Sequence, residues 1–321
     1  MNLVQRLGCL ALLLSTTLFA APVAQAGPFE FHSDFWLNLH HFLYEQALSA
    51  SRRSPNLSGD EKGKWDKALS FYRQNMTKHD LLFDQHMNDI DTELAEDETL
   101  PKLVVNGPDG ALWDTLNSVA PVYRAHWWID HDQANRKFIA SAVPLVQHYG
   151  PTFIKQLTTI FETTWPKDPI RVDVSEYANW AGAYTYTYGW SRVHEVVSSF
   201  DEANQGNATL EILFHEATHG IVPSNSGRLA DQISLASKSQ GVRTPKDLFH
   251  IFIFYTAGEL ARRDLAVAYV PYADKKRLYQ DKWSAWHSSI EVYWKQHIDG
   301  TLSFNDAVKK IVEETGKKLG K

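Results

Sequence analysis

The most informative stretch of this sequence is Phe214-His215-Glu216-Ala217-Thr218-His219-Gly220, which bears on both the fold and the chemistry. Its apolar surroundings predict a helix, which Pro223 would prevent from continuing. Side chains four residues apart on a helix lie one above the other, so His215 and His219 can offer two imidazoles to one metal ion. Glu216 lies between them, where it can reach a water bound to that ion. The stretch therefore predicts half of a catalytic metal site.

Three segments before this helix alternate between apolar and polar residues, which predicts β-strands. They are residues 170–174, 183–188 and 192–198, and the last two are separated by a turn at Gly189, as in a hairpin. We expect a small mixed or antiparallel sheet packed over the motif helix.

The rest of the chain has helical periodicity. Before the strands, helical patterns begin near residues 34, 58, 111, 133 and 152, and Trp165-Pro166-Lys167-Asp168-Pro169 then breaks the series. After the motif, further helices are expected at about residues 244–264, 275–298 and 303–319. The predicted fold is α+β and mostly α. It has a helical N-terminal region (27–165), then a region with the sheet, the motif helix and a helical C-terminal part (166–321).

The N-terminus has the layout of a secretory signal peptide. Arg6 precedes an apolar run, and Ala24-Gln25-Ala26 resembles a cleavage site, so residues 1–26 are expected to be removed. The single cysteine, Cys9, lies in this segment, which favours a bacterial periplasmic or secreted protein without disulfides. No later segment is long and apolar enough for a membrane span. The net charge of −6 and the absence of a basic stripe argue against nucleic-acid binding.

A catalytic zinc needs a third protein ligand and an open fourth position. The helix expected over 244–264 is almost wholly apolar, but it contains His250, Tyr255 and Glu259. His250 and Glu259 are nine residues apart, so they face opposite sides of a straight helix and only one can complete the site. We expect Glu259, because a carboxylate in apolar surroundings is costly unless it is paired or binds a metal. The alternatives remain open: Glu259 in an ion pair with Arg262 or Arg263, and His250 as the ligand or as a core histidine.

The motif and the following helix-borne glutamate resemble the zincin metallopeptidases, specifically the gluzincin arrangement, over residues 206–263. The resemblance implies Zn²⁺ held by His215, His219 and Glu259, with Glu216 as general base. It also implies that an edge strand before the motif helix, formed by residues 184–188 or 194–197, pairs with extended peptide substrate.

Zinc would polarise the scissile carbonyl and acidify a water from which Glu216 takes a proton. Tyr255 is the first candidate for a donor to the developing oxyanion, and His287 is the second. The expected function is an exported zinc-dependent peptidase acting on a peptide or protein substrate. The alternative is a catalytically silent zincin-fold protein that binds protein or metal.

Overall fold

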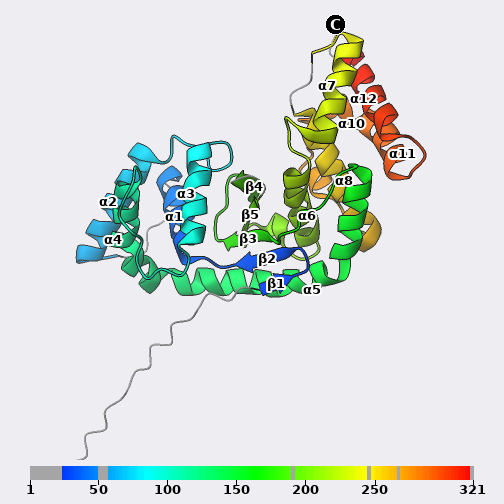
Figure 1. The fold of residues 1–321 in the computed structure, drawn as a ribbon. Helices are drawn as coiled ribbons and strands as arrows, with labels where there is room; N and C mark the ends of the chain where they lie inside the picture. The colour runs from blue at the N-terminus through cyan, green and yellow to red at the C-terminus, as the bar shows by residue number, and fades with distance from the viewer. Residues whose placement is uncertain (1–23, 50–56, 189–191, 244–246, 266–267, 319–321) are drawn as a thin grey trace, which may run out of the picture.

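The computed structural model describes residues 24–49, 57–188, 192–243, 247–265 and 268–318. The fold is α+β and mostly helical, with 63% helix, 9% strand and one small mixed sheet, which confirms the predicted fold class at this level. A helical N-terminal lobe and a helical C-terminal part flank the sheet. One long helix runs beneath the lobe and the sheet and then turns up beside the C-terminal part (Figure 1).

The N-terminal part combines two short strands with five helices. Its elements are β1 (Ala24–Ala26), β2 (Phe29–His32), α1 (Phe35–Leu48), α2 (Gly59–Asn75), α3 (Gln85–Glu96), α4 (Gly110–His126) and α5 (Trp128–Ile160). Asp34 caps α1 as expected, because its carboxylate accepts hydrogen bonds from the amides of Trp36 and Leu37.

The strands predicted from alternation are confirmed, and helices follow them to the C-terminus. The elements are β3 (Ile170–Ser175), β4 (Ala183–Tyr188), β5 (Arg192–Ser198), η1 (Glu202–Asn204), α6 (Ala208–Ile221), α7 (Gly227–Gln240), α8 (Leu248–Leu265), α9 (Tyr272–Lys275), α10 (Ser284–Ser289), the π-helical η2 (Ile290–Trp294), α11 (Lys295–Ile298) and α12 (Phe304–Lys318). The expected helix start at residues 244–246 lies outside the described residues.

The sheet has the strand order β1-β2-β3-β5-β4. The inner pairs β2–β3 and β3–β5 are parallel, whereas β1–β2 and β4–β5 are antiparallel. The antiparallel pairing expected for the hairpin of β4 and β5 is therefore confirmed, whereas the expected turn at Gly189 lies outside the described residues. This pairing makes β4 the edge strand beside α6.

The two faces of the sheet pack against different cores. Val193 and Val197 of β5 join the core formed with α5, α6 and α8. Tyr184 and Tyr186 of β4, which point to the opposite face, join the core of the N-terminal lobe. Alternation along each strand thus divides the molecule into two apolar layers with the sheet between them.

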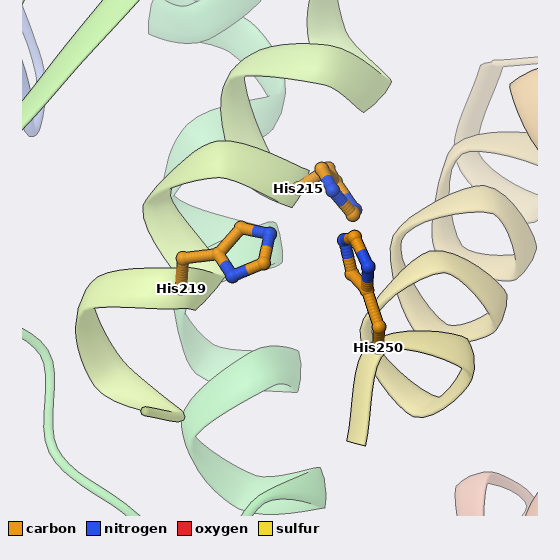
Figure 2. A group of neighbouring side chains, drawn as sticks. All are labelled: His215, His219 and His250. Carbon is orange, nitrogen blue, oxygen red and sulfur yellow. The ribbon is translucent and has the colours of Figure 1, made fainter. Parts of the chain in front are cut away.

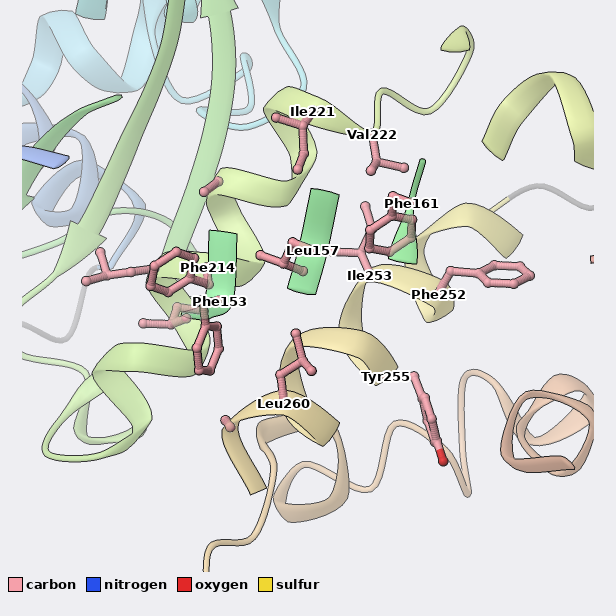
Figure 3. Packing of buried hydrophobic residues seen from close by; sticks show 14 of the residues in the cluster. Phe153, Leu157, Phe161, Phe214, Ile221, Val222, Phe252, Ile253, Tyr255 and Leu260 are labelled. Carbon is pink, nitrogen blue, oxygen red and sulfur yellow. The ribbon is translucent and has the colours of Figure 1, made fainter. Parts of the chain in front are cut away.

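Helix α5 connects the two cores, although the sequence predicted two helices at 133–149 and 152–163. Pro144 and Pro151 lie inside the continuous helix. A proline removes one backbone hydrogen bond, but the buried face of α5 continues past both prolines. Phe153 and Leu157 pack beside Phe214 of α6 in this core (Figure 3).

Three other features differ from the sequence prediction. Strands β1 and β2 were not predicted, and β1 falls within the expected signal peptide. Helices α3 and α7 were not predicted either. The helix expected over 275–298 is broken into short pieces, with Arg277 at a positive φ of 56° between α9 and α10.

The predicted boundary near residue 165 does coincide with the gap between α5 and β3. However, β2 from the N-terminal side pairs with β3, so both parts of the chain contribute to one sheet. In the described part of the chain, no helix is both long and apolar enough to cross a membrane.

Candidate metal centre

The motif lies on α6, a helix that is buried along almost its whole length. One side of α6 faces β4 and β5, and another packs against α8. The helix ends at Ile221, where the Val222 amide makes the last hydrogen bond to Thr218 and Pro223 follows. Successive side chains on a helix point about 100° apart, so neighbouring residues of the motif contact different elements, either the strands β4 and β5 or helix α8.

Three imidazoles converge between α6 and α8. His215 and His219 project from α6 and His250 from α8 (Figure 2). One nitrogen of each ring lies within 4.8 Å of a nitrogen of the others. The ring centroids are 5.0 Å apart for His215 and His219, 4.9 Å for His219 and His250, and 5.5 Å for His215 and His250.

The three imidazoles are held in the neutral form that metal binding requires. Burial and the neighbouring imidazoles of His219 and His250 lower the pKa of His215 well below its usual range. Burial lowers the pKa of His219 to about 4. Burial, His219 and Lys282 lower the pKa of His250.

The buried Nδ1 of His215 has no hydrogen-bond partner among the described residues. An orphaned buried nitrogen is costly, and a metal would satisfy it. Three imidazoles with no thiolate are the donor set of a catalytic zinc site that keeps one open position, so the residues fit zinc.

Aromatic rings enclose the three histidines. The Phe254 ring lies 3.8 Å from the His215 ring, centroid to centroid, and the Trp283 ring lies 5.6 Å from that of His250. This apolar wall explains the low imidazole pKa values, because low-dielectric surroundings disfavour the charged form.

Glu216 faces the sheet. Thr185 of β4 donates a hydrogen bond of 2.8 Å from Oγ1 to Glu216 Oε2, and the same hydroxyl lies 3.0 Å from the Glu216 carbonyl oxygen. Burial raises the pKa of Glu216 to about 7, an effect that the Thr185 hydrogen bond partly opposes. A carboxyl that titrates near neutrality is suited to take up and return a proton.

The expected position of Glu259 beside His215 and His219 is wrong. Arg263 donates to Glu259 Oε1 at 2.7 Å and Arg262 donates to Oε2 at 2.5 Å, while Lys295 lies 3.6 Å from Oε1. Burial opposes ionisation of Glu259, but the hydrogen bonds from Arg262 and Arg263 outweigh it and lower its pKa. The ion-pair alternative is the one observed, and His250 takes the third place in the cluster.

Tyr255 and His287, the expected oxyanion donors, lie on the Glu259 side of α8. Both line a cavity of about 220 Å³ together with Glu259, and none of the three clustered histidines lines it. The Tyr255 hydroxyl points away from the apolar core (Figure 3). Tyr255 and Glu259 are four residues apart and lie on the same face of α8, as helix periodicity predicts. However, this face does not point toward the histidines of α6.

Two polar residues near Glu216 were missed by the sequence analysis. Thr185 is one, although its place in an alternating strand before the motif helix is a usable signal. The other is Glu195 of β5, a buried carboxyl whose pKa is raised by burial and by the nearby charge of Glu216. Comparisons of the chain with protein-family models, curated proteins and solved structures gave no match.

Proposed function

We propose that this protein is an exported zinc-dependent metallohydrolase, a peptidase, in which His215, His219 and His250 hold the metal. The observation that carries the proposal is the convergence of three neutral imidazoles, that of His215 buried and those of His219 and His250 half-buried. The carboxyl of Glu216, the residue after His215, lies on the sheet side of the same helix. Export rests on the signal-peptide pattern of residues 1–26.

Each residue has a distinct role in this proposal. His215, His219 and His250 would hold zinc, which would supply Lewis acidity at the site. Glu216 would accept a proton from the attacking water and return it to the leaving amine. The Thr185 hydroxyl holds one oxygen of Glu216 and so orients its carboxyl group.

The edge strand gives a reason to prefer a peptide as substrate. β4 pairs with β5 along one side only and is the last strand of the sheet. An extended peptide could add to the other side through backbone hydrogen bonds. Because Thr185 of β4 touches Glu216, a peptide paired there would lie close to the base.

The test compares metal binding and turnover in matched variants of the full chain. Glu216→Gln should keep zinc at wild-type stoichiometry and lose about 10²- to 10⁴-fold in kcat on a peptide library. His250→Ala should lose zinc. Zinc binding without turnover of any peptide by the wild type would refute the peptidase and favour a silent binding protein. A failure of the purified wild type to bind zinc would refute the metal site itself.

A further inference from the structure

Glu195 is a buried carboxyl on the surface of the sheet that α6 covers. Along β5, Val193 and Val197 flank it on the same face and belong to the core shared with α6. The contact is close, since a Cβ built at Gly220 of α6 would lie 2.4 Å from Val193 Cγ2. In the sheet, Glu195 is directly opposite Thr185, the residue that bonds Glu216. The register therefore places the Glu195 and Glu216 carboxyls at one small contact between β5, β4 and α6.

The surroundings of Glu195 offer it no charge partner. The residue is completely buried, and neither carboxyl oxygen has a hydrogen-bond partner among the described residues. Its neighbours across the sheet are Val172 on β3 and Thr185 on β4. Within the described ranges, the charged group that acts on it is Glu216 of α6. Burial, and then the Glu216 carboxylate, raise the pKa of Glu195 well above its usual range.

An ionised carboxylate in this position would cost several kcal/mol, because neither water nor a cation compensates it. A neutral carboxylic acid avoids most of that cost and has one O–H to donate. The Thr185 side chain lies opposite Glu195 and bonds Glu216, so the Glu216 carboxyl is the acceptor that this geometry offers to the Glu195 O–H.

We propose that Glu195 is a positioning residue of this site: a neutral acid that donates its proton toward Glu216 and, with Thr185, fixes the orientation of the Glu216 carboxylate. The contribution to turnover rests on the proposed function, but the pairing of the two carboxyls does not. Glu216 is then held by two donors from neighbouring strands, Thr185 on β4 and Glu195 on β5.

Infrared difference spectroscopy of the full chain at pH 7 tests the pairing without using turnover. The difference between the wild-type and Glu195→Gln spectra should contain the carbonyl band of a protonated carboxylic acid, which we assign to Glu195. In Glu216→Gln the same band should shift, since its acceptor has changed. Glu211→Gln is the matched control: this buried carboxyl of α6 is bound by Tyr269 and Tyr272 instead, so its removal should leave the Glu195 band in place. Absence of the band, or a band that ignores Glu216→Gln, would overturn the pairing.

Kinetics of zinc-loaded variants test the positioning role. Glu195→Leu fills the space without a donor, and we expect it to keep its zinc and its fold while kcat falls about ten- to a hundredfold at unchanged KM. Glu195→Gln retains a donor and should recover most of that loss. Full kcat in the leucine variant would mean that Glu195 is only a core residue. If the zinc-loaded wild type hydrolyses nothing, the proposed function fails, whereas the infrared shift still decides whether the two carboxyls pair.

Discussion

The identity of the third histidine-cluster member determines which kind of metal centre we propose for this chain. His250 brings a neutral imidazole, so the protein donors carry no charge of their own. A glutamate would have added a negative charge and reduced the net charge of the metal site. A three-histidine set therefore leaves zinc a stronger Lewis acid toward its water.

Substitution of His250 and Glu259 separates the two ligand assignments. His250→Ala should weaken zinc binding by more than about a hundredfold, because even outer partners of a ligand typically contribute about ten- to a hundredfold. Glu259→Gln should leave zinc affinity unchanged and reduce stability, because Arg262 and Arg263 lose their buried acceptor. Titration calorimetry on both variants checks this. Weaker zinc binding in Glu259→Gln alone would restore the gluzincin assignment.

At the scale of elements, the site depends on how closely α6 approaches its neighbours. Gly220 lets α6 approach β5, and Gly258 lets α8 approach Pro271 and the Glu211 carboxyl. Glu211 accepts hydrogen bonds from the Tyr269 hydroxyl and the Tyr272 amide. It thereby connects α6 to the segment that follows α8.

The contact at Gly220 predicts an overpacking effect. Gly220→Ala should lower the free energy of unfolding by about 1–3 kcal/mol, because the new methyl group meets Val193. Combining Gly220→Ala with Val193→Ala should make room for the new methyl group, so that Gly220→Ala lowers the free energy of unfolding much less in the Val193→Ala background. Gly63→Ala on α2 is the control: nothing lies within 4 Å of its Cβ position, so this variant should gain about 0.5–1 kcal/mol. Urea denaturation measures all three, and a stabilised Gly220→Ala would contradict the close packing.

The raised pKa of the buried Glu211 carboxyl leads us to expect that the stability of the fold depends on pH. Burial raises its pKa to about 7, although hydrogen bonds from Tyr269 and Tyr272 act in the opposite direction. The folded chain therefore binds this proton more tightly than the unfolded chain. The associated stability is complete below about pH 4.5 and is lost as pH rises through about 7.

Unfolding free energies of the wild type and Glu211→Gln at pH 5 and pH 8 check this sign. Relative to the variant, the wild type should lose about 1–3 kcal/mol between the two pH values. A difference that stays constant, or one that grows in favour of the wild type, would show that the Glu211 pKa is not raised.

At the scale of the whole molecule, the sheet joins parts of the chain that are far apart in sequence. Phe29 of β2 is opposite Ile170 of β3, and α5 covers the sheet from below. On the other face, a buried polar network connects the sheet to the N-terminal lobe: Tyr184 donates to Asp91, which also lies 3.1 Å from His41 Nε2. Strand β4 thus contacts the N-terminal lobe through its tyrosines and Glu216 of α6 through Thr185.

Because of this shared sheet, residues 166–321 alone should not fold. The fragment lacks β2, which lies next to β3, and the aromatic side chains of α5 that pack against Phe214. We expect it to show no cooperative thermal transition by near-ultraviolet circular dichroism and no stoichiometric zinc binding, in contrast to the full chain. A fragment that unfolds cooperatively and binds zinc would mark it as an independent domain.

The features that could be predicted from the sequence alone are those that depend on residues close together along the chain. Apolar alternation located β3, β4 and β5, the cap at Asp34 located α1, and the motif placed His215, Glu216 and His219 on one helix. The sequence also limited the candidates for the third proposed ligand to His250 and Glu259. Each of these signals is local, because helix and strand periodicity is set within a few residues.

Only the tertiary structure decided which face of α8 meets α6. His250 and Glu259 lie about 180° apart on that helix, and both faces carry apolar residues, so periodicity could not rank them. Because of how α8 packs against α6, His250 lies beside His215 and His219, whereas Glu259 lies on the other face of α8 and pairs with Arg262 and Arg263. The pairing of β2 with β3 and the burial of Glu195 could not be predicted from the sequence either, because both depend on contacts between segments that are distant in the chain.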